Sequence, residues 1–130
     1  MESDSIELPS FLKTAMKLAK KSNGLYMLGS CLVSAGRFLS GGYNKYHSMN
    51  PLAREFFGYP TVHAEMDALN GVSKESIKGS VLYVFRIRRD GSPGMSMPCR
   101  RCQNALRNLG IRKVIYSTAV APYWGQLKVS

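Results

Sequence analysis

Cysteine is scarce in this chain, whose 130 residues contain only three, at positions 31, 99 and 102. An odd and small number excludes a disulfide scaffold, so the chain has to be stabilised by a hydrophobic core of its own. The hydrophobic content of 45% is sufficient for such a core and predicts a single domain over residues 1–130. We interpret Cys31, inside an apolar segment, as a small buried hydrophobic side chain.

Long apolar runs are also absent, because no stretch approaches the roughly 20 residues that a membrane-spanning helix needs. The first ten residues, MESDSIELPS, lack the basic and apolar regions of a secretory signal. We therefore expect a cytoplasmic protein without a membrane partner.

Acidic residues are few, with 8 against 18 lysines and arginines, which gives a net charge of +10. From residue 86 onward Asp90 is the only acid, and most of the basic residues there crowd together: Arg86, Arg88, Arg89, Arg100, Arg101, Arg107, Arg112 and Lys113. Such a distribution favours an anionic partner, either a phosphate-bearing small molecule or nucleic acid. The alternative is a solvated basic surface without a specific ligand.

The hydrophobic pattern alternates between helical and strand periods along the chain. We expect, in order, a helix over 10–21, a hairpin over 25–34 and 38–44, a helix over 61–71, a buried strand over 80–88, a helix over 99–109, a buried strand over 112–118 and a last edge strand or hairpin within 119–130. Residues 45–60 form the longest irregular stretch, and such a loop in a small domain is usually functional. This order predicts an α/β sandwich with helices packed on one sheet.

Cys99 and Cys102, here called the thiol pair, stand at the start of an expected helix. Their spacing places both sulfurs on one side, and the positive helix terminus favours thiolates. A redox pair is one possible use, but Pro98 precedes the pair, and a strand–CxxC–helix unit near the start of a thioredoxin fold is absent. Metal binding is the other use.

A metal site needs further ligands, and the chain has two histidines, His47 and His63. If His63 met the thiol pair, three protein ligands and one water would hold Zn²⁺ as in a catalytic site. Glu65 would then lie near the metal and could carry a proton. Each residue also has a plainer interpretation alone: a histidine that caps a helix, a surface acid, or a coincidental cysteine spacing.

The segment HAE at 63–65, followed by PCRRC at 98–102, resembles the signature of the zinc-dependent cytidine/deoxycytidylate deaminase superfamily. The resemblance covers most of the chain. It implies a three-layer α/β/α sandwich of the cytidine deaminase-like type, with a mixed sheet of about five strands and a short C-terminal edge strand. It also implies one catalytic Zn²⁺ on His63, Cys99 and Cys102, with Glu65 as the catalytic acid and base. The reaction would be hydrolysis of a cyclic amidine C–N bond, which turns cytosine into uracil and releases ammonia.

The segments HAEMDAL and SGGYN are most similar to the deoxycytidylate deaminase branch. That similarity implies that Asn44 lies beside the base and sugar, with Ala64 and Pro98 as further substrate contacts. His47, in the long loop, could contact the substrate or a second ion, or be an ordinary surface histidine. A fourth zinc ligand at His47 would close the site and contradict an enzyme.

Three functions follow from these residues. The first is a deaminase of a free cytosine nucleotide, most simply dCMP to dUMP. The second is a deaminase acting on cytosine in single-stranded DNA or on a base in RNA, favoured by the net charge and by aromatic residues interleaved with basic ones in the long loop. The third is a zinc-stabilised binding module without catalysis, against which Glu65 argues. A homo-oligomer is expected from the resemblance alone.

Overall fold

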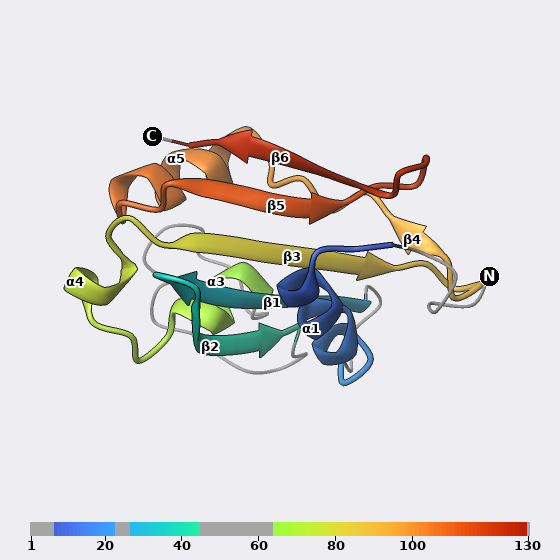
Figure 1. Ribbon diagram of the computed structural model, residues 1–130, viewed down its shortest axis with the longest axis horizontal. Helices are drawn as coiled ribbons and strands as arrows, with labels where there is room; N and C mark the ends of the chain where they lie inside the picture. The colour runs from blue at the N-terminus through green and yellow to red at the C-terminus, as the bar shows by residue number, and fades with distance from the viewer. Residues whose placement is uncertain (1–6, 23–26, 45–63, 130) are drawn as a thin grey trace.

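The computed structural model describes residues 7–22, 27–44 and 64–129, and for residues 64–66 only the backbone (Figure 1). Within these ranges the elements follow in this order: α1 (Ser10–Ala19), β1 (Met27–Ser34), β2 (Arg37–Tyr43), α3 (Ala64–Leu69), α4 (Lys74–Ile77), β3 (Val81–Ile87), β4 (Pro93–Gly94), α5 (Arg100–Asn108), β5 (Lys113–Ser117) and β6 (Trp124–Lys128). The chain therefore alternates helices and strands as expected.

One mixed sheet forms the middle of the molecule, with the strand order β2-β1-β3-β5-β6 and the short β4 paired to the end of β3. β1 pairs antiparallel with both β2 and β3, β3 and β5 are parallel, and β6 returns antiparallel along β5. The β1–β2 hairpin turns through Ala35 and Gly36, both with positive φ, as a two-residue turn requires. The last strand is the edge strand expected from the sequence.

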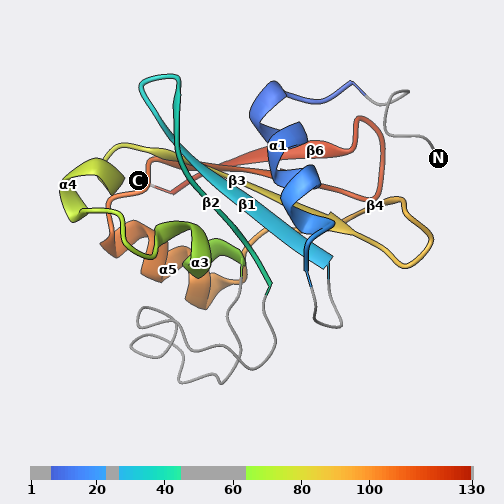
Figure 2. The same ribbon diagram turned by 90° about the horizontal axis from the view of Figure 1, so that it is seen from below.

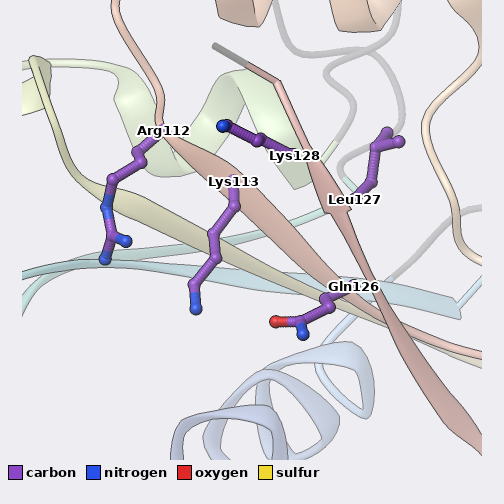
Figure 3. Close-up of a pocket in the computed structure, with 5 residues that line it drawn as sticks. All are labelled: Arg112, Lys113, Gln126, Leu127 and Lys128. Atoms are coloured by element: carbon purple, nitrogen blue, oxygen red, sulfur yellow. The ribbon is translucent and has the colours of Figure 1, made fainter.

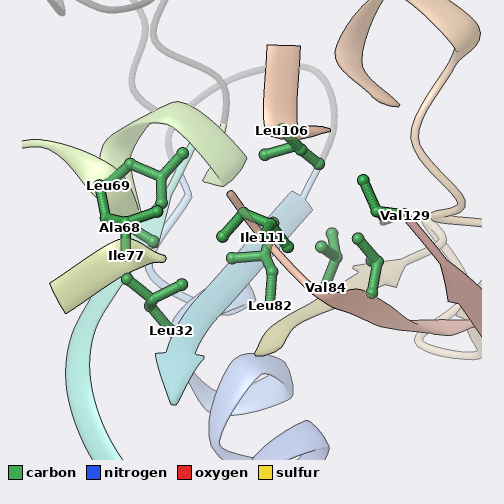
Figure 4. Close-up of a cluster of buried hydrophobic side chains, with 10 residues drawn as sticks. Leu32, Ala68, Leu69, Ile77, Leu82, Val84, Leu106, Ile111 and Val129 are labelled. Atoms are coloured by element: carbon green, nitrogen blue, oxygen red, sulfur yellow. The ribbon is translucent and has the colours of Figure 1, made fainter. Parts of the chain in front are cut away.

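Helices cover both faces of the sheet, with α1 on one face and α3 and α5 on the other (Figure 2). Side chains that alternate along the central strands consequently enter two separate cores. The core beneath α3 and α5 contains the ten residues drawn in Figure 4: Leu32, Ala68, Leu69, Ile77, Leu82, Val84, Leu106, Ile111, Val114 and Val129. The core beneath α1 contains Leu8, Leu12, Ala15, Cys31, Val33, Val81, Phe85 and Ile115. The expected three-layer α/β/α sandwich is confirmed.

Two glycines allow the helices to approach the sheet closely. A Cβ at Gly29 would collide with the backbone of Ala15 in α1, and a Cβ at Gly42 would collide with the backbone of Ala68 in α3. Because these neighbours are backbone atoms, they could not move aside as a flexible side chain can. Gly42 thus allows α3 to lie directly against the end of β2, where the candidate site lies.

The expected elements are present, with small differences in extent. The first helix ends at Ala19 rather than at residue 21, and Asn23 and Gly24, expected to end it, lie outside the described residues, as does the loop 45–60. The short α4 and the two-residue β4 were not expected from the sequence, because neither is long enough to show a hydrophobic period. No helix in the described ranges has the length and apolar character needed to cross a membrane.

Candidate active site

The candidate site lies where parallel strands end and two helices begin. Because β2 and β3 are both antiparallel to β1, and β5 is parallel to β3, the strands β2, β3 and β5 all run in one direction. α3 and α5 lie on the same face and both begin toward the carboxyl ends of these strands (Figures 1 and 2). This edge is where open α/β sheets usually bind ligands.

The thiol pair occupies the first turn of α5. Cys99 is the N-cap residue with an extended backbone, and its side chain is exposed and makes no capping hydrogen bond. Cys102 follows within the first turn and is half-buried, and neither thiol is in a disulfide. Arg100 and Arg101, both exposed, add positive charge to the positive end of the helix. The positive end of the helix and the two adjacent cations favour an anionic ligand at this part of the chain.

A buried serine pair, Ser96 and Ser117, holds the segment that leads into α5. The Ser117 hydroxyl donates to the Gly94 carbonyl (2.7 Å) and accepts from the Arg86 N–H (2.9 Å). The Ser96 hydroxyl donates to the Val84 carbonyl (2.9 Å) and accepts from the Ser117 N–H (2.8 Å). The Ser96 N–H also donates to the Ser117 carbonyl at 3.0 Å. The segment is therefore fixed to the carboxyl ends of β3 and β5 just before the thiol pair.

Gln103, within α5, also stabilises the start of this helix through two hydrogen bonds. Its side-chain amide donates to the carbonyl of the buried Pro98 at 2.8 Å, and its backbone N–H donates to the carbonyl of Cys99 at 2.8 Å. The conformation of the residue before the first thiol is thus fixed from within the same helix.

Asn44 directly follows β2, at the same edge of the sheet. Its N–H donates to the Leu28 carbonyl (3.0 Å), and the preceding Tyr43 N–H donates to the Asp67 carboxylate of α3 (3.2 Å). The Asp67 contact joins the end of β2 to α3 one turn after Ala64. Asn44, the start of α3 and the start of α5 consequently share one edge of the sheet.

Several predicted site residues cannot be placed. His63 and His47 lie outside the described residues, and the side chains of Ala64 and Glu65 are not described, although both residues belong to the first turn of α3. Among the described residues no three metal-binding side chains cluster together. The predicted set of His63, Glu65 and the thiol pair stays a prediction.

The residues that are described fit zinc. Thiolate sulfur is a preferred zinc ligand, and two thiols one turn apart at a helix start can bind a single ion. The exposed Cys99 side chain, without a capping hydrogen bond, is available as a ligand. His63, which lies outside the described residues, comes directly before α3 in the sequence, and α3 begins at the same edge of the sheet.

An α/β/α sandwich with paired thiols at the carboxyl ends of its parallel strands is the arrangement expected of a metal-binding α/β protein. The model of the cytidine and deoxycytidylate deaminase zinc-binding region matches residues 6–118. The chain therefore belongs to the cytidine and deoxycytidylate deaminase family, is an enzyme of that family and uses Zn²⁺. A comparison with curated protein sequences gives no match.

Solved structures of similar fold include dCMP deaminase from the cyanophage S-TIM5. Its apo form is 26% identical with a TM-score of 0.62, over 94% of this chain and 89% of that chain. Its complex with dCMP and dUMP is 25% identical with a TM-score of 0.61, over 91% and 84%. Cytidine deaminase from Mycobacterium leprae, 20% identical with a TM-score of 0.54 over 99% and 94%, shares the fold.

Four residues of the site were missed by sequence reasoning: Asp67, Ser96, Gln103 and Ser117. Asp67, Ser96 and Ser117 form hydrogen bonds with backbone groups far away in the sequence, and Gln103 with one about a helical turn away. The hydrophobic periodicity of a short segment does not predict such hydrogen bonds. A weak signal existed for Ser117, because a serine inside the apolar strand KVIYS needs a hydrogen-bond partner when buried.

Proposed function

We propose that this enzyme deaminates dCMP to dUMP and releases ammonia. The observation that carries the proposal is that Asn44, the start of α3 and the thiol pair lie at the same edge of the sheet. The cyanophage dCMP deaminase, of which one structure contains dCMP and dUMP, supports a cytosine nucleotide as the substrate class. The comparisons do not favour a polynucleotide substrate. The net charge of +10 suits a phosphate-bearing substrate.

In this proposal His63 and the thiol pair hold the zinc ion. Bound zinc lowers the pKa of a water ligand toward about 7 and so supplies a nucleophile at neutral pH. The resemblance to the family signature implies that Glu65 holds and transfers the proton beside the metal without binding it. The serine pair and Gln103 fix the backbone that presents the thiol pair, which keeps the ligand geometry constant.

The substrate base lies, in this proposal, between the end of β2 and the start of α5. Asn44 provides an amide for hydrogen bonds to the nucleoside. The Asp67 carboxylate positions Asn44, because it accepts a hydrogen bond from the N–H of the preceding residue, Tyr43. Ala64 offers backbone groups in the first turn of α3, and the buried Pro98 forms an apolar wall. His47 is a further candidate for a substrate contact.

The substrate class is tested by ultraviolet assays of the zinc-loaded protein on dCMP, cytidine and a cytosine-containing single-stranded oligonucleotide. We expect turnover of dCMP, with lower kcat/KM for cytidine because it lacks the phosphate. Turnover of the oligonucleotide alone would contradict the proposal and establish the polynucleotide alternative.

The role of Glu65 is tested by Glu65→Gln, with Glu75→Gln on the exposed surface of α4 as the matched control. We expect Glu65→Gln to keep stoichiometric zinc and an unchanged circular dichroism spectrum but to lose about 10³-fold in kcat, since it removes the proton carrier. Glu75→Gln should retain full activity. An active Glu65→Gln variant would remove Glu65 from the mechanism.

We also propose that residues 1–130 form one domain, and that the protein is cytoplasmic and homo-oligomeric. Light scattering of the purified chain tests the last point, for which a monomer at all concentrations would be the contrary result.

A further inference from the structure

A pocket with a mainly basic lining lies at the other end of the sheet from the thiol pair. It is a pocket of about 570 Å³ lined by Arg112, Lys113, Gln126, Leu127 and Lys128, here called the basic pocket (Figure 3). Its residues come from the amino end of β5 and from β6, whereas the candidate active site lies at the carboxyl ends of β3 and β5.

The basic pocket opens on the α1 side of the sheet. Lys113 alternates with Ile115, which belongs to the core beneath α1, so both project to that face. Figure 3 shows Arg112, Lys113 and Gln126 extending to the same side as α1, while Leu127 points away from it. The Arg112 guanidinium also lies near enough to Tyr83, on the same face, to oppose the rise in the pKa of Tyr83 that burial causes. The pocket and the candidate active site therefore occupy opposite faces.

The charges in the basic pocket are uncompensated within its lining. Lys113 and Lys128 are direct partners across the β5–β6 ladder, and like charges directly opposite each other destabilise a sheet. Arg112 adds a third cation beside them, and among the described residues no carboxylate lines the pocket. A bound anion would remove this repulsion.

The backbone that carries these cations is fixed by hydrogen bonds and strand pairing. The Arg112 N–H donates to the Ser80 carbonyl at 2.8 Å, and the Arg112 carbonyl accepts from the Val129 N–H at 3.0 Å. Lys113 and Lys128 belong to paired strands. The ordering cost of binding is consequently smaller than for cations on a free loop.

We propose that the basic pocket binds a compact polyphosphate anion. Its volume falls within the range of about 300–1,000 Å³ typical of small-molecule sites. Three cations and one amide match the several anionic oxygens of a polyphosphate, to which they can form charge-assisted hydrogen bonds. An apolar ligand is disfavoured, because four of the five residues that line the pocket are charged or polar. A single nucleic-acid strand is also disfavoured, because such sites combine an extended groove with stacking aromatic residues and the lining has none.

The experiment is isothermal titration calorimetry of the zinc-loaded full chain with inorganic tripolyphosphate. The test variant is Lys113→Gln/Lys128→Gln, and the matched control is Lys20→Gln/Lys74→Gln, which removes the same charge from two exposed positions outside the pocket. We expect the test variant to weaken binding by about 10- to 100-fold, because two charge-assisted contacts are lost. The control should change affinity by less than about threefold, as expected for exposed distant charges.

Chelation of zinc by tripolyphosphate would affect both variants equally, so it cannot mimic the expected difference. The deaminase activity of Lys113→Gln/Lys128→Gln should equal that of the unmodified chain, which separates this inference from the proposed function and reports correct folding.

Equal weakening in both variants would overturn the proposal and attribute binding to the overall charge. Full affinity in the test variant would also overturn it. A single-stranded oligothymidine that binds more tightly than tripolyphosphate, and loses affinity only in the test variant, would replace the polyphosphate site with a nucleic-acid surface.

Discussion

The same amino acid occupies two opposite environments in this molecule. Cys31, in the middle of β1, is fully buried in the core beneath α1, and its thiol donates to the Phe11 carbonyl at 3.2 Å. Burial raises its pKa to about 12, from an ordinary 9.0. Cys99 is exposed at the positive end of α5, and its side chain makes no capping hydrogen bond. The first thiol is kept neutral by burial, whereas the second is exposed at the start of a helix and accessible to a ligand.

The comparison shows that position, not residue type, decides the chemistry of a cysteine. A neutral thiol enclosed by apolar side chains cannot be a metal ligand, since ligation requires the thiolate. A thiol at a helix start meets both requirements, access and a favourable field. Changing each cysteine to the same residue is therefore the most direct way to break the comparison.

The largest expected effect comes from Cys99→Ala, compared with Cys31→Ala. Cys99→Ala should lose zinc and all measurable turnover, because it removes a predicted ligand, and should lose some stability because binding and folding are coupled. Cys31→Ala should keep zinc and turnover but lower the free energy of unfolding by about 1–2 kcal/mol through lost packing. Zinc analysis, ultraviolet assays and urea unfolding measure these effects.

Equal zinc content in Cys99→Ala and the unmodified chain would show that the ligand assignment is wrong. Loss of zinc from Cys31→Ala would erase the distinction between the two thiols.

The second expectation concerns alkaline pH. Since the pKa of Cys31 is higher in the folded than in the unfolded state, its contribution to stability is complete below pH 9 and is lost as pH rises toward 12. Over that range the free energy of unfolding should fall by up to about 1.4 kcal/mol per pH unit because of this group. Cys31→Ala should lack this component in urea unfolding series at matched pH. Parallel curves for the two proteins would refute the buried neutral thiol.

Much of this architecture could be predicted from the sequence. The apolar periods of β1, β3, α5 and β5 gave elements within a few residues of those observed, because each buries a face against a core. Cys31 was correctly interpreted as a buried hydrophobic side chain, and Cys99 was correctly placed at the start of a helix.

Interactions between segments that are far apart in the sequence could not be predicted from it. Gly42 approaches α3 because of tertiary packing, and Ser96 meets Ser117 across two connections of the chain. The same limit applies to the basic pocket, because the pairing of Lys113 with Lys128 depends on the register of β5 and β6. Hydrophobic patterns within a segment predict its helix or strand, whereas strand register and side-chain hydrogen bonds are determined only when the helices and strands pack together.

A smaller effect is expected from Ser117→Ala, which sharpens the comparison by weakening the support of the thiol pair and leaving Cys31 unchanged. The matched control is Ser80→Ala, which removes another fully buried hydroxyl, one that donates to the Ile77 carbonyl at the amino end of β3. Both should lose about 1–3 kcal/mol of stability, because buried partners are left unsatisfied. Only Ser117→Ala should also weaken zinc binding, by about tenfold, as expected for support of metal ligands.

Competition with a chromogenic zinc chelator measures this affinity. Equal zinc affinities in the two serine variants would mean that the serine pair stabilises the fold without positioning the thiol pair.

The smallest expected effect is that of Gln103→Ala, with Asn104→Ala on the exposed side of α5 as the control. Gln103 donates a single neutral hydrogen bond to the Pro98 carbonyl, and such a bond contributes about 0.5–1.5 kcal/mol. If that energy orients the residue before the first thiol, kcat/KM should fall about three- to tenfold while zinc content stays stoichiometric. Gln103→Glu should fall further, because an ionised carboxylate cannot donate and would repel the same carbonyl. A Gln103→Glu variant as active as Asn104→Ala would show that helix propagation from Cys99 alone suffices to present the thiol pair.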